Sequence, residues 1–92
     1  MKAISEDDVQ KAVDWLRDNA EACAKARATR IYLEEYRKSI KALLMSKYQD
    51  LSVSAQEREA YAHDDYISHL KTLKEAIYQD ERLRFFRASA EV

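Results

Sequence analysis

The side chains best able to do chemistry in this chain are two histidines and one cysteine. His63 and His69 are six residues apart, which places them on different sides of one helix, and only Asp65 can share a face with His69. Two ligands are too few for a zinc site, and no Glu-x-x-His or His-x-x-x-His motif supplies the others. We therefore expect a solvated pair of Asp65 and His69 and no metal site.

Cys23 has no histidine at helical spacing, and Ala20 and Ala24 lie on either side of it in the sequence. The pattern predicts a small apolar side chain that fills space, with no catalytic thiol. A single cysteine cannot form an internal disulfide, which favours a reducing compartment.

The sequence contains no glycine, so it can form neither a phosphate-binding loop nor a dinucleotide-binding turn. The carboxylates fall in acidic helix starts or on faces that we expect to be exposed. We therefore predict that the protein is not an enzyme, with no catalytic residue, no cofactor and no small-molecule substrate.

Basic side chains form a stripe near the middle of the chain, at Arg27, Arg30, Arg37, Lys38 and Lys41. Residues 22–48 hold seven bases and two acids (net +5), whereas residues 1–21 and 49–92 are each net −3. One interpretation is that the basic helix pairs with acidic neighbours. The other is that the stripe binds a nucleic-acid backbone, with tyrosines adding stacking.

The helix that must carry this stripe also has an apolar seam. Its residues recur in steps of four and three, the heptad spacing of a packed helix: Ala22, Ala26, Thr29, Leu33, Tyr36, Ile40 and Leu43. The basic stripe faces away from this seam at 100° per residue. A second seam at similar spacing, Tyr66, Leu70, Leu73 and Ile77, lies near the end of the chain.

Capping signals predict helices over about 6–17, 19–48, 55–62 and 65–90. Ser5 precedes three acids, and residues 54–57 form a Ser-x-x-Glu capping box that starts the third helix, with Asp64 capping the fourth. Asp18 and Glu21 form a similar box, and the apolar stripe shifts by half a turn there. Either the helix breaks near Asp18-Asn19, or it runs on and its ends face different partners.

Composition and length agree with an all-α single domain over residues 1–92. The chain has 36% charged and 47% hydrophobic residues and no proline, which is typical of long helices and argues against tight β-hairpins. A short loop near residues 49–53 favours antiparallel neighbours. We predict an antiparallel hairpin of two long helices, flanked by shorter helices.

Several apolar side chains lie off both seams, near the two ends of the chain: Val9, Val13, Leu16, Leu83, Phe85 and Phe86. We expect them to form an exposed apolar patch, because no further helix in the sequence would cover them. A two-fold dimer is the commonest solution for a small protein. These residues are therefore the predicted interface of a homodimeric bundle.

No apolar run approaches the ~18 residues of a membrane span, and the acidic start MKAISEDDVQ lacks the apolar region of a signal peptide. We expect a cytoplasmic protein that does not contact membranes.

The stretches YLEEYRKSIKALLM (residues 32–45), SAQEREAYA (54–62) and the following DDYISHLKTLKEAI resemble a group of small all-helical proteins encoded by bacteriophages and prophages. This resemblance implies a bacterial host cytoplasm and a place near phage recombination or replication, and it assigns no functional residue.

Three functions are compatible with these patterns. The first is a non-enzymatic helical protein-interaction module that binds itself first. The second is an accessory nucleic-acid-binding protein in phage DNA processing. The third is an inhibitor of a host DNA-acting enzyme, in which acidic segments 1–21 and 49–65 imitate a nucleic-acid backbone.

Overall fold

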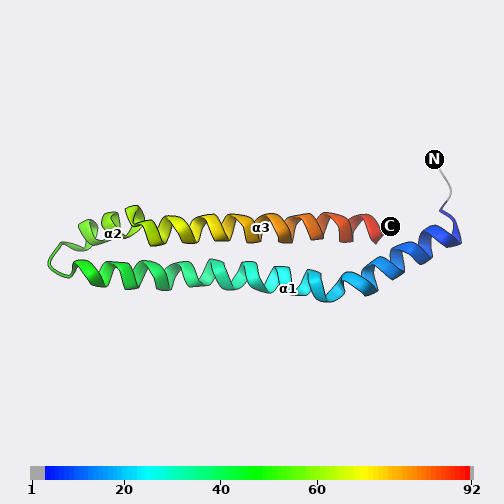
Figure 1. Cartoon of the computed structure of the whole chain (residues 1–92), viewed down its shortest axis with the longest axis horizontal. Coiled ribbons are helices and arrows are strands. Elements are labelled where there is room, and N and C mark those ends of the chain that lie inside the picture. The colour runs from blue at the N-terminus through cyan, green and yellow to red at the C-terminus, as the bar shows by residue number, and fades with distance from the viewer. Residues whose placement is uncertain (1–3, 92) are drawn as a thin grey trace.

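The computed structural model describes residues 4–91, and this part of the chain is helical apart from short connections, with no strand. A long helix, α1 (Glu6–Met45), continues into a 3₁₀ turn, η1 (Ser46–Tyr48). The chain then reverses into α2 (Val53–Ala62) and α3 (Asp64–Ala90). The prediction of an all-α fold is confirmed. Figure 1 shows α1 and α3 lying side by side and antiparallel, with α2 at the end where the chain reverses, here called the closed end.

The molecule is a thin rod, with principal dimensions of 67 × 25 × 16 Å. Its radius of gyration is 20.3 Å, whereas a compact chain of this length would have about 12 Å. The first turns of α1 extend past the end of α3 (Figure 1). The rod is therefore only one layer of helices thick.

The predicted break near Asp18-Asn19 is wrong, and the alternative that the helix runs on is correct. α1 is continuous through this region, although it bends in its N-terminal third (Figure 1). The Asn19 side chain donates to the backbone carbonyl of Trp15 at 2.9 Å, a bond made within the helix. Asp and Asn cost a helix interior only a few tenths of a kcal/mol, less than the hydrogen bonds that a break would remove.

Besides the box at Asp18, the sequence predicts three cap residues, and one of these three predictions is correct. Ser5 caps α1 and forms a capping box with Asp8. The predicted cap at Ser54 is wrong, since Ser52 caps α2 by accepting from the backbone N–H of Ala55 at 3.2 Å. The predicted cap at Asp64 is also wrong, because the His63 side chain accepts from the N–H of Asp65. Starting α2 earlier adds helical hydrogen bonds, including one from the N–H of Gln56 to the carbonyl of Ser52.

The two long helices contact each other along faces rotated from the predicted seams. On α1 the covered residues are Cys23, Ala26, Arg30, Leu33, Ile40 and Leu44, whereas the predicted positions Ala22, Thr29, Tyr36 and Leu43 are exposed. On α3 the covered residues are Tyr66, His69, Leu73, Ala76, Asp80 and Leu83, whereas Leu70 and Ile77 are exposed. Half of each predicted apolar seam therefore remains open to solvent.

The buried core is small and lies near the closed end. Leu44, Ala60 and Tyr66 form its centre, with Ile40 and Met45 packed against them. Within residues 4–91 no large side chain is fully buried. Of the helices in this range, none combines the length and apolar character that a membrane span requires.

Candidate interaction surface

The predicted basic stripe is divided by the fold, because Arg30 turns toward α3. Its Nε donates to Asp80 and its Nη1 donates to Glu34 at 3.0 Å. The side chains of Arg30 and Asp80 are only 23% and 12% exposed. The hydrogen bond with Asp80, and then that with Glu34, raises the pKa of Arg30. This arginine is therefore engaged inside the molecule.

Lys41 also turns inward. Its Nζ lies 3.4 Å from a carboxylate oxygen of Glu57 and 4.8 Å from the centre of the Tyr61 ring. Tyr61 first, and then Glu57, raises the pKa of Lys41. The prediction that Arg30 and Lys41 face away from the packed side is wrong, because the contact face of α1 is rotated toward them.

The other three residues of the predicted stripe behave differently. Lys38 is exposed and pairs with Glu35 at 3.4 Å on its own helix. Among residues 4–91, no carboxylate lies within ion-pair distance of Arg27 or Arg37. The structure thus does not bring the five basic residues together as one surface.

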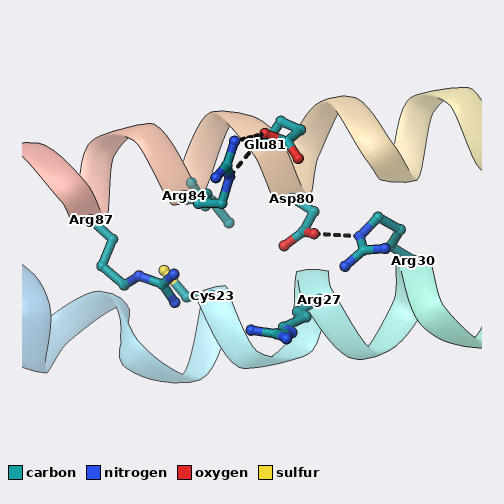
Figure 2. A pocket seen from close by; sticks show the side chains of 8 residues that line it. Cys23, Arg27, Arg30, Asp80, Glu81, Arg84 and Arg87 are labelled. Atoms are coloured by element: carbon teal, nitrogen blue, oxygen red, sulfur yellow. Dashed lines mark hydrogen bonds and ion pairs between the residues drawn. The ribbon is translucent and has the colours of Figure 1, made fainter.

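Arg27 instead lies with arginines of α3 that the sequence patterns did not single out. A groove of about 270 Å³ between the helices is lined by Cys23, Arg27, Arg30, Asp80, Glu81, Leu83, Arg84 and Arg87. Figure 2 shows Arg84 turned toward Glu81, to which it donates at 2.7 Å, and Arg87 reaching toward Cys23. Asp80, Arg84 and Arg87 follow the same four-three spacing as Cys23, Arg27 and Arg30, so helical phase was the available signal.

A second, mostly apolar groove of about 460 Å³ adjoins the arginine groove. Its lining is Trp15, Leu16, Ala20, Cys23, Ala24, Arg27 and Arg87. Cys23, Arg27 and Arg87 belong to both grooves. The small side chains of Ala20 and Ala24 leave room there for another helix. Together the two grooves form one channel, whose α1 side is apolar at Leu16, Ala20 and Ala24 and basic at Arg27.

The predicted protein interface lies at the end of the rod away from α2, here called the open end. Val9 and Val13 are about half exposed, Phe85 is 66% exposed, and Leu16 and Leu83 are half-buried. The Trp15 and Phe86 rings pack at a centroid distance of 6.2 Å, which joins α1 to the end of α3. Arg82 and Arg84 lie over the rings of Phe86 and Phe85. The fold therefore gathers both halves of this predicted interface at the same end.

Another apolar groove, of about 600 Å³, also runs between α1 and α3. Its lining includes Ala22, Ala26, Thr29 and Leu33 from α1 and Thr72, Ala76 and Leu83 from α3. Four of these, Ala22, Ala26, Thr29 and Leu33, are members of the predicted seam, and α3 leaves Ala22 and Thr29 exposed.

Both histidines make hydrogen bonds with the backbone of this chain. The prediction of a solvated Asp65–His69 pair is wrong, because His69 is buried and its Nε2 lies 2.8 Å from the carbonyl oxygen of Leu33. Asp65 lies beside His63 instead, at 3.8 Å. Within residues 4–91 no group of three His, Cys, Asp or Glu side chains could hold a metal ion.

Comparison of the chain with protein-family models, with curated proteins and with solved structures gives no match. The resemblance to phage-encoded helical proteins stays a prediction. Function is therefore inferred from the geometry of the surface alone.

Proposed function

We propose that this protein is a helical protein-interaction module that associates first with a second copy of itself. The observation that carries the proposal is the amount of apolar surface that one hairpin leaves uncovered. Within residues 4–91, sixteen large hydrophobic residues are exposed, while only four hydrophobic residues are buried. A partner that covers these side chains gains about 25 cal/mol for each Å² of apolar surface removed from water.

The total surface area supports the same proposal. One chain exposes 7199 Å², whereas a compact monomer of 10.8 kDa would expose about 5,500 Å². The excess is roughly 1,700 Å², larger than the ~800 Å² that each partner buries in a standard interface. A two-fold dimer closes such an interface on itself and so limits assembly to two chains.

Light scattering on a size-exclusion peak tests self-association. We expect a mass of two chains at concentrations on the order of 10–100 µM, an ordinary range for a moderate interface. A peak that keeps the mass of one chain, 10.8 kDa, across this range contradicts the proposal.

A second candidate function is binding of a nucleic-acid backbone, and one observation favours it. Arg27, Arg84 and Arg87 share a groove, although Glu81 and Glu91 partner the two arginines of α3. Protein interaction remains the better supported function, because Arg30 and Lys41 are engaged within the chain.

Labelled single- and double-stranded DNA, titrated over a salt series, tests this second function. A phosphate-binding groove gives affinity that falls steeply with salt, by about one unit of slope for each phosphate neutralised. Arg27→Glu should weaken that binding more than Lys38→Glu, a matched reversal outside the groove. Absence of binding at low salt removes the second function.

A further inference from the structure

The start of α1 presents one face that α3 does not cover. Val9, Val13, Leu16 and Ala20 follow each other in steps of four, three and four, so they lie along one side of the helix. Glu6 lies within about 60° of Val9 on this side, whereas Asp7 lies nearly opposite. Both valines are about half exposed. This face therefore reads, in chain order, as an acid followed by apolar residues.

The channel formed by the two grooves has the opposite arrangement along α1: its apolar residues come first in the chain and its basic residue comes last. Its first part is lined by the small and apolar side chains of Leu16, Ala20 and Ala24, and Arg27 follows further along α1. Arg87 of α3 reaches toward Cys23, beside this first part (Figure 2), and is paired with Glu91.

A helix that fills the channel needs apolar side chains over the alanines and an acid over Arg27. Asp80 and Glu81, which also line the channel, pair with Arg30 and Arg84. Arg27 is therefore the arginine that should attract an acidic side chain of the occupant.

The start of α1 in a second copy meets this requirement in one direction only. Placed antiparallel, its acidic first turn lies over Arg27 and its valines lie over Ala24 and Ala20. Placed parallel, its acids would lie over the apolar part and its valines over Arg27. The antiparallel direction is also the one that a two-fold axis across α1 produces.

We propose that two copies associate about such an axis, with residues 6–16 of each α1 lying antiparallel in the channel of the other copy. In the register that places Glu6 against Arg27, Val9 meets Ala24 and Val13 meets Ala20, so large side chains meet small ones. The two Leu16 side chains then lie near the axis. Arg17, which also lies close to the axis, is already paired with Asp14 and Asp18 of its own helix.

This proposal rests on the proposed self-association and names the surface and the direction of the partner. It keeps Val9, Val13 and Leu16 of the predicted interface. In place of Leu83, Phe85 and Phe86 of the predicted interface, it makes Ala20, Ala24 and Arg27 the other main contacts.

Charge reversal and its rescue test the proposal. Glu6→Arg and Arg27→Glu should each weaken the dimer by about tenfold or more, because each change places two pairs of like charges together across the axis. The double variant Glu6→Arg/Arg27→Glu restores both pairs with opposite polarity and should return most of the lost affinity. Concentration-dependent light scattering or analytical ultracentrifugation measures each dissociation constant.

Asp7→Arg is the matched control for Glu6→Arg. It reverses a charge in the same first turn and costs the helix N-terminus the same favourable interaction, but it points away from the proposed contact. We expect its dissociation constant to stay within about twofold of that of the unchanged protein. Far-UV circular dichroism on all variants confirms equal helix content.

The outcomes separate the two proposals. A single-chain mass for the unchanged protein overturns self-association and this interface together. A dimer that Glu6→Arg and Asp7→Arg affect equally, or that the double variant fails to restore, keeps self-association and overturns this interface. A stable dimer in which Arg27→Glu abolishes only DNA binding assigns the basic groove to nucleic acid and also overturns it.

Discussion

The closed and open ends of the rod are built from the same two long helices, yet only one of them holds a core. At the closed end, α2 adds a third helix, and Leu44, Ala60 and Tyr66 are buried together. At the open end only α1 and α3 are present, and the Trp15–Phe86 contact leaves half of Phe86 exposed.

The difference follows from how many sides of a residue its neighbours can cover. Two parallel cylinders share one line of contact, so most apolar residues beside that line keep water on one side. A third helix, even one of ten residues, closes that side. We therefore expect the free energy of unfolding to reside mainly at the closed end, while the open end supplies the surface for association.

The largest expected effect is that of Leu44→Ala. Leu44 is 3% exposed, and truncating a leucine in such a site costs about 2–5 kcal/mol of stability. Leu83→Ala removes the same atoms from a half-buried site near the open end and should cost clearly less. Urea denaturation monitored by circular dichroism measures both. Equal costs for the two variants would contradict the division between the ends.

A smaller loss is expected when the core is overfilled. Ala60 has no exposed surface, so Ala60→Leu should cost about 1–3 kcal/mol. Ala88→Leu places the same side chain on the exposed surface of α3, and we expect it to change stability by less than about 0.5 kcal/mol. Thermal denaturation of both variants at equal concentration provides the comparison. A tolerated leucine at residue 60 would mean that α2 can move aside.

Removing the cap of α1 and removing the cap of α2 should change stability by different amounts, because the two caps lie at different places in the rod. Ser52→Ala removes the cap of α2 and should lower stability by about 0.5–2 kcal/mol, whereas Ser54→Ala should lie within error. Ser5→Ala removes a cap beyond the end of α3, so it should fray the first turn of α1 with a smaller effect on the unfolding transition. Denaturant midpoints test the first two variants, and amide hydrogen exchange near residues 6–9 tests the third.

The smallest expected effect depends on pH and concerns Lys41, which ties α1 to α2. Because Tyr61 and Glu57 raise the pKa of Lys41 above its ordinary value of 10.5, the charged lysine stabilises the folded state. This contribution is complete below pH 10.5 and is lost as the pH rises through the higher folded-state pKa. Melting temperatures between about pH 9 and 12 should fall less for Lys41→Met than for the unchanged protein. Identical pH profiles would show that Lys41 contributes nothing.

The sequence was sufficient to predict the helices. It was poor at predicting which side of each helix packs against its neighbour. Apolar or small residues occur at both 22 and 23, and at both 43 and 44, so an α1 contact face rotated by part of a turn satisfies the hydrophobic pattern about equally well. The pair Arg30–Asp80, fifty residues apart, is one contact that belongs to the observed rotation only. A single sequence holds no local signal for such a pair.

The cap at Ser5 was predicted correctly, whereas two other capping motifs were misleading for a related reason. The Ser-x-x-Glu pattern at 54–57 and the Asp-x-x-Glu pattern at 18–21 both occur inside helices. A cap side chain gains about one hydrogen bond, and continuing the helix past it gains as much from the backbone. The basic groove was missed because Arg84 and Arg87 become neighbours of Arg27 only through the hairpin.

The long contacts of the hairpin are arranged in an order that should govern how it forms. Moving outward from α2, the paired residues are separated along the chain by 16 residues for Lys41–Glu57, 36 for Leu33–His69 and 50 for Arg30–Asp80. Each pair, once made, shortens the chain that the next pair must close, so the entropy of loop closure is overcome in small steps. With no proline in the sequence, no slow peptide-bond isomerisation interrupts the process. The hairpin should zip from α2 toward the open end and unzip in the reverse order, so the surface offered to a partner is the last to form and the first to open.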